Sequence, residues 1–154
     1  MNFIHVVQKG RVTDFSKDAH WPVDKHKLLI FFPESFTPVC ESELGQLESW
    51  LGKFADEDTF VAAACTDPPE SVAEWFRVDE KLKDATFPIF CSHELARSFG
   101  VLDPSLRAKR ATVLITTEGE TIRQEHLFKT GRSLKELYRT VYVHNHGTEK
   151  GYDE

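Results

Sequence analysis

Short apolar runs alternate with polar or amphipathic stretches along the chain, and each run predicts a buried strand. The four runs occupy residues 28–32, 59–65, 87–91 and 112–116. Continuous apolar segments of this length are typical of strands that are covered on both faces. Two hairpins complete the pattern. One turns at Lys9-Gly10, and the other turns at Glu118-Gly119 into a partner strand over residues 121–128.

The stretches between these strands show helical periodicity. After Cys40, apolar residues recur at the spacing of one helix face, at Leu44, Leu47, Leu51 and Phe54. Cys40 lies four residues before the first of them, so its thiol extends that stripe to the start of the helix. A second helix is expected after Asp67, its predicted cap, with Pro68 at its first position. Its apolar face would carry Val72, Trp75, Phe76 and Leu82.

The other segments are shorter or more polar. Ser92 is the predicted cap of a short helix that Gly100 ends. Ser133 and Glu136 form a capping box for a last helix. Residues 16–27 are expected to form a loop, and residues 144–154 a polar, flexible tail.

The order of these elements predicts the fold class. Strands that alternate with helices imply right-handed crossovers and a mostly parallel sheet, to which the last hairpin adds an antiparallel edge. We therefore predict an α/β chain with a thioredoxin-like fold, in which helices flank a central mixed sheet after an N-terminal extension. Residues 1–143 would form its single domain. Ligands of such sheets bind beyond the carboxyl ends of the strands, where residues 33–39 and Cys40 are placed.

Composition and charge narrow the range of functions. The 154 residues suit one domain, and the formal net charge of −6 argues against nucleic acid or an anionic membrane as partner. No apolar stretch approaches the roughly 18 residues of a membrane span. The first residues do not resemble a secretory signal. We therefore expect a cytoplasmic protein.

Cysteine and histidine spacing gives no indication of a metal or cofactor. Cys40, Cys65 and Cys91 are 25 and 26 residues apart without a C-x-x-C pair, which is typical of reduced thiols rather than of a zinc ribbon or a disulfide scaffold. His144 and His146 fall in the predicted tail, where a solvated segment is the simpler interpretation than a metal site.

The segment around Cys40 carries a motif. Pro33, Thr37 and Cys40 stand in the spacing P-x-x-x-T-x-x-C, and the stretch SFTPVCESELG at residues 35–45 resembles the active-site signature of the peroxiredoxins, closest to the one-cysteine branch. Three further stretches resemble the same family: residues 87–103, 109–119 and 131–139. This resemblance implies a thiol peroxidase that reduces hydrogen peroxide or organic hydroperoxides.

The resemblance also implies roles for individual residues. Cys40 would attack the peroxide as a thiolate, which a helix N-terminus and the cation of Arg110 both favour. Thr37 would exchange hydrogen bonds with the peroxide, Pro33 would line the pocket, and Glu43 would orient the arginine. Each has a simpler rival role: Pro33 could end a strand, Thr37 could brace a turn and Arg110 could lie on the surface.

The sequence does not determine how oxidised Cys40 is reduced again. No cysteine follows Cys91, so the C-terminal thiol of the typical two-cysteine branch is missing. Cys65 or Cys91 would resolve the sulfenic acid in an atypical two-cysteine mechanism, or both are inert core thiols. We favour the one-cysteine route, with thioredoxin, glutaredoxin or glutathione as the external thiol. The resemblance implies a homodimer or a larger ring. The alternative to an enzyme is a binding protein, a non-catalytic oligomer with the thioredoxin-like fold that binds unfolded chains.

Overall fold

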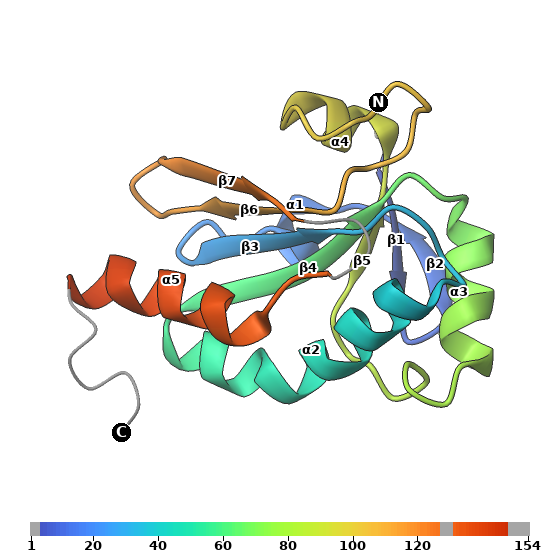
Figure 1. Cartoon of the computed structure of the whole chain (residues 1–154), viewed down its shortest axis with the longest axis horizontal. Helices are drawn as coiled ribbons and strands as arrows, with labels where there is room; N and C mark the ends of the chain where they lie inside the picture. The colour runs from blue at the N-terminus through green and yellow to red at the C-terminus, as the bar shows by residue number, and fades with distance from the viewer. Residues whose placement is uncertain (1–3, 127–130, 148–154) are drawn as a thin grey trace.

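A central seven-stranded sheet organises the computed structural model, which describes residues 4–126 and 131–147. The strands lie in the order β2-β1-β5-β4-β3-β6-β7 (Figure 1). Their bounds are β1 His5–Gln8, β2 Arg11–Asp14, β3 His26–Phe31, β4 Thr59–Cys65, β5 Ile89–Cys91, β6 Ala111–Ile115 and β7 Thr121–Glu125. The helices are α1 Lys17–His20, α2 Pro38–Asp56, α3 Pro69–Val78, α4 His93–Ser98 and α5 Leu134–His146. This is the predicted thioredoxin-like α/β architecture.

The sheet is less parallel than the order of elements predicted. Only β3–β4 and β4–β5 are parallel, whereas β1–β2, β1–β5, β3–β6 and β6–β7 are antiparallel. Helical crossovers enforce parallel pairing only within the segment from β3 to β5. The N-terminal hairpin pairs with β5, and the last hairpin pairs with β3. The prediction of a mixed sheet is therefore confirmed, whereas the prediction that most of its strands pair in parallel was wrong.

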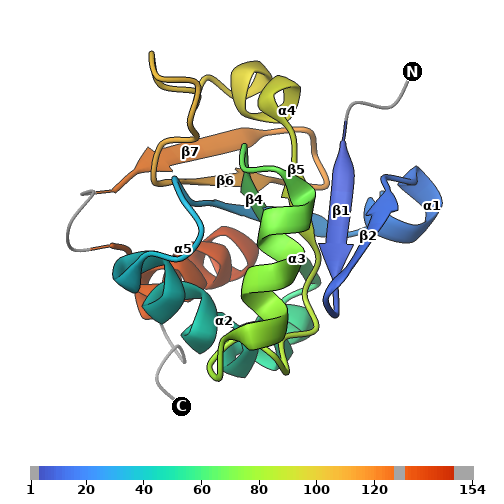
Figure 2. The ribbon, with the colours of Figure 1, turned by 90° about the vertical axis from the view of Figure 1, so that its right-hand side faces the viewer.

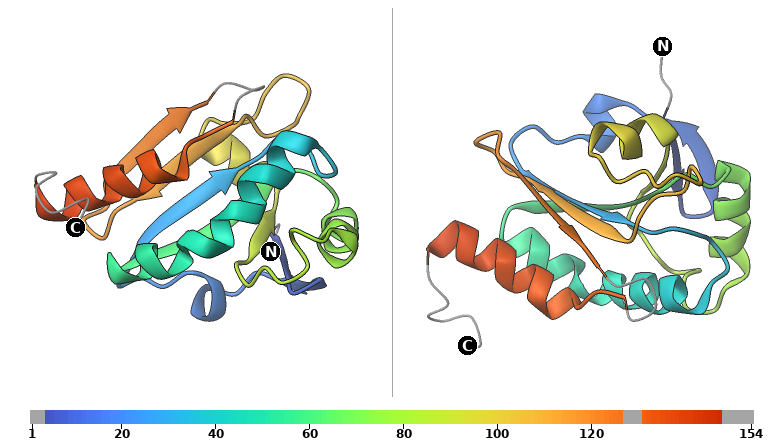
Figure 3. Two further views of the ribbon diagram at one scale, coloured as in Figure 1. Left: turned by 60° about the horizontal axis from the view of Figure 1, so that its bottom comes forward. Right: turned by 45° about the horizontal axis from the view of Figure 1, so that its top comes forward.

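Alternate residues of the strands build two cores, one on each face of the sheet. Leu28, Ile30 and Phe32 pack under α2, α3 and α5, while Leu29 and Phe31 face the side of α4. Figures 2 and 3 show α4 on the face opposite α2 and α5, which run side by side. Burial on both faces explains the continuous apolar run that begins at Leu28 in β3, as the sequence predicted.

Helix α2 has the predicted stripe and carries Cys40 in its first turn. Leu44, Leu47 and Phe54 are buried along one face. Pro38 occupies the first helical position, where its missing N–H costs nothing and its fixed φ suits a helix. Thr37 precedes it in an extended conformation. The chain therefore turns sharply from β3 into α2 and places Cys40 at the carboxyl edge of the sheet.

Two predicted helix ends differ from the structure. Asp67 does not cap α3: Pro68 is the N-cap residue, and the Asp67 carboxylate accepts a hydrogen bond from the Ser35 backbone N–H at 2.6 Å. Leu82 is buried, but it lies beyond the last residue of α3. The capping residue was misassigned because a distant loop competes for its carboxylate.

Helix α5 continues past the predicted domain boundary at residue 143. Ser133 caps it, accepting from the Glu136 backbone N–H at 3.2 Å, and it ends at His146 with Gly147 in the left-handed region. Asn145 contacts His26 at 2.8 Å, and His146 contacts Glu57 at 2.9 Å. Residues 144–146 are thus part of the folded domain rather than of a tail, whereas 148–154 lie outside the described residues.

Other local predictions have clear outcomes. The hairpin at Lys9-Gly10 is confirmed, with both residues at positive φ. The predicted loop 16–27 contains the short helix α1 and the first two residues of β3. Residues 127 and 128 of the last predicted strand lie outside the described part. Among the described helices, none is long and apolar enough to cross a membrane.

Candidate active site

Cys40 lies fully buried at the N-terminus of α2, with none of its surface exposed. The first turn of a helix presents backbone N–H groups without helical partners, and the macrodipole adds partial positive charge there. Both features place partial positive charge beside the sulfur. The turn after β3 therefore supplies half of the electrostatic environment that the sequence predicted for this cysteine.

Arg110 supplies the other half. It directly precedes β6, which pairs with β3 on the side away from β4. Its side chain is buried. Its Nη2 donates to Sγ of Cys40 at 3.4 Å, and its Nη1 donates to Glu43. The structure thus brings together Cys40 and the arginine that the sequence nominated 70 residues away.

Glu43 joins two arginines from different elements. It follows Cys40 by three residues on α2, so the two side chains share one face of the helix. One carboxylate oxygen contacts Arg110, and the other accepts from Arg132 Nε at 2.8 Å. The Arg132 backbone N–H donates to the same oxygen, also at 2.8 Å. Each buried charge is therefore paired, as burial requires.

Arg132 is the main site residue that the sequence analysis did not name. Its guanidinium also donates to the carbonyl of Phe31, to that of Ala111 at 2.9 Å and to Oγ1 of Thr112 at 3.1 Å. It thereby fastens the end of β3 and the start of β6 to α2. Burial lowers the pKa of Arg132, but adjacent Glu43 opposes that shift. The available signal was the stretch GRSLKELYR, which was used only to support the family resemblance.

Thr37 and Pro33 lie on the loop between β3 and α2. The Thr37 hydroxyl donates to the Glu34 carbonyl at 2.8 Å, which leaves its lone pairs available to accept. Pro33 is buried two residues after the end of β3. Asp67 holds this loop through Ser35, and Arg107 contacts Glu34 at 3.0 Å. The loop is thus anchored from two other segments.

His126 extends the polar network beyond the arginines. Its backbone N–H donates to the Arg110 carbonyl at 2.8 Å, and its Nε2 lies 2.8 Å from Oγ1 of Thr112. That hydroxyl accepts from Arg132 and keeps one lone pair and one hydrogen, so the imidazole tautomer decides which of the two groups donates. Burial, followed by the charge of Arg132, lowers the pKa of His126 to about 4.

Cys65 and Cys91 end the neighbouring strands β4 and β5, and both are buried. They are partners in the strand register, with their sulfurs 3.9 Å apart. Burial, reinforced by the contact with Cys91, raises the pKa of Cys65 well above its usual range. The structure therefore gives Cys65 another cysteine as its contact and favours its neutral thiol.

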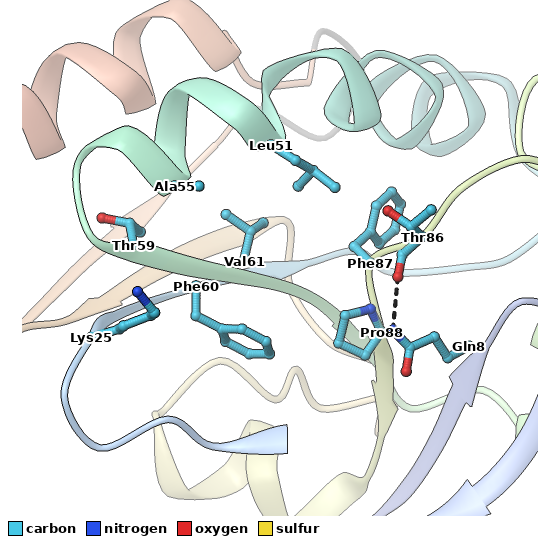
Figure 4. A pocket seen from close by; sticks show the side chains of 10 residues that line it. All are labelled: Gln8, Lys25, Leu51, Ala55, Thr59, Phe60, Val61, Thr86, Phe87 and Pro88. Carbon is cyan, nitrogen blue, oxygen red and sulfur yellow. Dashed lines mark hydrogen bonds between the residues drawn. The ribbon is translucent and has the colours of Figure 1, made fainter. Parts of the chain in front are cut away.

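Two cavities differ in whether they border the residues around Cys40. One of about 300 Å³ opens at the amino end of β4, among side chains that include Lys25, Leu51, Phe60 and Phe87 (Figure 4). It lies at the opposite end of β4 from Cys65 and holds none of the site residues. A second, of about 270 Å³, is lined by Val39, Glu43 and Arg132. It adjoins the Glu43–Arg132 end of the cluster, and Cys40 is not among the described residues that line it.

A cluster of possible metal ligands lies elsewhere, where His26, Glu118 and His144 place ligand atoms within 4.8 Å of one another. Both ring nitrogens of His26 are already engaged. Nδ1 accepts from the Thr117 backbone N–H at 3.1 Å, and Nε2 lies 2.8 Å from Oδ1 of Asn145. A backbone N–H can only donate, so metal binding through His26 would cost one of these bonds. The hydrogen bonds at the end of α5 therefore account for this cluster without a metal ion.

Comparison with known proteins agrees with this geometry. A buried cysteine beside an arginine on a thioredoxin-like sheet is the arrangement of a thiol-dependent peroxidase. Residues 7–124, more than half of the chain, match the model of the AhpC/TSA family. The chain belongs to this family, the peroxiredoxins, as its Cys40 segment had indicated.

Proteins of similar sequence are named peroxiredoxins. The peroxiredoxin-type protein YkuU of Bacillus subtilis is 30% identical over 126 residues, covering 77% of this chain and 69% of its own length. Peroxiredoxin TSA1-B of Candida albicans is 34% identical over 125 residues, covering 76% and 63%. The chain thus spans about two thirds of the length of these relatives.

Solved structures share the fold over nearly the whole chain. AhpC of Enterococcus faecalis superposes with a TM-score of 0.82 at 25% identity, covering 96% of this chain and 93% of its own. AhpC of Mycobacterium bovis gives a TM-score of 0.84 at 22% identity, covering 96% and 92%. The second comparison, at its lower identity, supports the fold alone.

Proposed function

We propose that this protein reduces hydroperoxides with Cys40 as the peroxidatic nucleophile. The observation that carries the proposal is the 3.4 Å contact between Arg110 Nη2 and Cys40 Sγ, in a buried cluster at a helix N-terminus. A thiolate is the nucleophilic form of cysteine, and the guanidinium and the helix N-terminus both present positive charge to this sulfur. Hydrogen peroxide or an organic hydroperoxide is the substrate class.

The chemical step can be assigned to atoms. The Cys40 thiolate attacks the terminal oxygen of the hydroperoxide, so that an S–O bond forms as the O–O bond breaks. The terminal oxygen keeps its hydrogen and becomes the sulfenic acid, and the departing alkoxide or hydroxide takes a proton from water. Arg110 donates hydrogen bonds to the oxygens as negative charge develops on them. Glu43 and Arg132 hold Arg110 in place.

Thr37 and Pro33 position the substrate in this proposal. Because the Thr37 hydroxyl donates to Glu34, its oxygen accepts the hydrogen of the peroxide rather than donating to it. This directs the terminal oxygen toward the sulfur. Pro33, buried and without an N–H, shields the reacting atoms from water.

We propose that an external thiol resets Cys40 by the one-cysteine route. The first thiol forms a mixed disulfide with Cys40 and releases water, and a second thiol frees Cys40 and leaves as a disulfide. Thioredoxin, glutaredoxin or glutathione would supply these thiols. Support comes from Cys65, whose raised pKa and contact with Cys91 make it a poor nucleophile toward Cys40.

Peroxide consumption with an excess of a small dithiol tests the function. The wild type should turn over, Cys40→Ser should not, and the double variant Cys65→Ser, Cys91→Ser should retain turnover. Activity in Cys40→Ser would refute Cys40 as the nucleophile. Loss of activity in a folded double variant, together with a mapped disulfide to Cys40 in the wild type, would replace the one-cysteine route by the atypical two-cysteine one.

We also propose that the protein assembles at least as a homodimer. β7 is an edge strand, mostly exposed and paired on one side only. Such an edge tends to be covered or paired by another chain. Sedimentation equilibrium at micromolar concentration should give a mass of twice 17.7 kDa or more. A purely monomeric species would contradict the proposal.

A further inference from the structure

Cys65 and Cys91 form a pair of their own. They are register partners at the carboxyl ends of the parallel strands β4 and β5. Side chains of register partners leave the sheet on the same face, and these two belong to the same core cluster. Their sulfurs lie 3.9 Å apart, and only 1% of Cys65 and 4% of Cys91 is exposed. The mechanism proposed above uses neither thiol.

The strand register of the pair is compatible with the Cα spacing of a disulfide. Neighbouring strands lie about 4.8 Å apart, and the Cα atoms of disulfides are usually about 4.4–6.8 Å apart. The sulfurs must approach to about 2.05 Å. Rotation of both side chains, with a small approach of the two strand ends, closes the remaining gap between the sulfurs.

We propose that Cys65 and Cys91 are a second redox site, a buried dithiol that is oxidised to an intramolecular disulfide by small-molecule disulfides. One cysteine attacks the small disulfide, forms a mixed disulfide and releases one thiol. The other cysteine then attacks the bound sulfur and releases the second thiol. The protein loses two electrons and two protons, and the small disulfide is reduced to two thiols. This chemistry is independent of Cys40.

Burial sets the rate of this reaction. The attacking species is a thiolate, and the pKa of Cys65 is raised by burial and by its neighbour. Opening of the strand ends must therefore precede exchange. We expect oxidation over minutes to hours at neutral pH, and faster oxidation at higher pH because the thiolate fraction rises.

The position of the pair links it to the loop that precedes Cys40. Asp67, two residues after Cys65, accepts from the backbone N–H of Ser35 in that loop. The Asp67 backbone also lowers the pKa of Cys65, against the larger effect of burial. A bond between Cys65 and Cys91 therefore acts on a segment that holds the entrance to α2.

The test uses Cys40→Ser, which removes peroxide chemistry and leaves only the two thiols of the pair. The protein is equilibrated in mixtures of reduced and oxidised glutathione, then denatured and alkylated, and its intact mass is measured. We expect the two alkylation sites to disappear together, with a mass lower by two hydrogens than the reduced protein, and peptide mapping to give a Cys65–Cys91 link. Dithiothreitol should reverse it.

Two controls make the result decisive. Cys40→Ser, Cys91→Ser should gain at most one glutathionyl group, and Cys40→Ala serves if Cys40→Ser folds poorly. Independent alkylation of both thiols at every glutathione ratio would overturn the proposal, as would stable glutathionylation without a link, or a link that forms only in denaturant. Because these variants lack Cys40, the outcome is separate from that of the peroxidase assay.

Discussion

Glu43 holds Arg132 through both the side chain and the backbone of the arginine. Nε and the backbone N–H of Arg132 each donate to the same carboxylate oxygen at 2.8 Å. The second oxygen is left for Arg110, which contacts Cys40. One carboxylate therefore fixes both cations, and the position of the arginine beside the thiol depends on a residue that does not itself touch the sulfur.

Replacing Arg110 by lysine should slow peroxide reduction by about 100-fold, because lysine keeps the charge but cannot contact Cys40 and Glu43 in the same fixed geometry. Stopped-flow measurement of Cys40 oxidation by hydrogen peroxide gives the rate. Arg97→Lys is the matched control, since Arg97 lies on the surface and pairs with Glu94. A loss of less than threefold in a folded Arg110→Lys protein would contradict the role of Arg110.

Thr37→Val should reduce kcat/KM for hydroperoxide by about 100-fold while costing only about 1 kcal/mol of unfolding free energy. Valine matches threonine in shape but offers no oxygen to accept the peroxide hydrogen. Thr37→Ser keeps that oxygen and should recover most of the rate. Steady-state kinetics and urea unfolding separate the two effects. Equal kinetics for the valine and serine variants would show that the hydroxyl only braces the loop.

The sequence predicted the parts of the site that lie on one segment. Pro33, Thr37, Cys40 and Glu43 follow one another through a strand end and a helix start, so their spacing determines their arrangement. Arg110 was found only through a resemblance, because periodicity cannot show which distant strand ends beside Cys40. Arg132 was missed for the same reason, and its hydrogen bonds to three segments exist only in the folded chain.

For the fold as well, features set by neighbouring residues were predicted, whereas features set by contacts between distant residues were not. Helix periodicity correctly predicted the buried face of α2. The antiparallel pairing within each hairpin was predicted correctly, but the antiparallel β1–β5 and β3–β6 pairings were not expected in a mostly parallel sheet, because a hairpin strand can join either edge of a sheet. Asp67 was expected to cap α3, but the backbone of Ser35 takes its carboxylate. Contacts of Asn145 and His146 likewise keep the end of α5 ordered, although its polar sequence resembles a tail.

Arg132→Met should lower the unfolding free energy by about 3–5 kcal/mol, because it leaves Glu43 with one fewer partner and removes several buried hydrogen bonds. It should also slow Cys40 oxidation, since Arg110 loses its fixed carboxylate. Urea unfolding measures the first effect. Arg139→Met, on the surface of α5 beside Glu136, should cost less than about 1 kcal/mol. Similar losses for both variants would contradict the structural role of Arg132.

The last prediction concerns pH and His126. Its pKa is lowered from 6.5 to about 4 in the folded protein, first by burial and then by the charge of Arg132; Arg110 lowers it further, and Glu43 opposes the shift. Between these two values the unfolded chain binds the proton that the folded chain excludes. Stability is therefore complete above pH 6.5 and falls as the pH drops toward 4.

Because His126 is only half-buried, we expect its contribution to be on the order of 1–2 kcal/mol, less than the full shift would give. Urea unfolding at several pH values between 7 and 4 measures it as the difference between wild type and His126→Gln, which cannot titrate. The difference should change steadily across this interval. His93→Gln, at an exposed position on α4, is the control and should follow the wild type more closely. If His126→Gln follows the wild type in parallel at every pH, the histidine does not exclude a proton in the folded protein, and the lowered pKa is wrong.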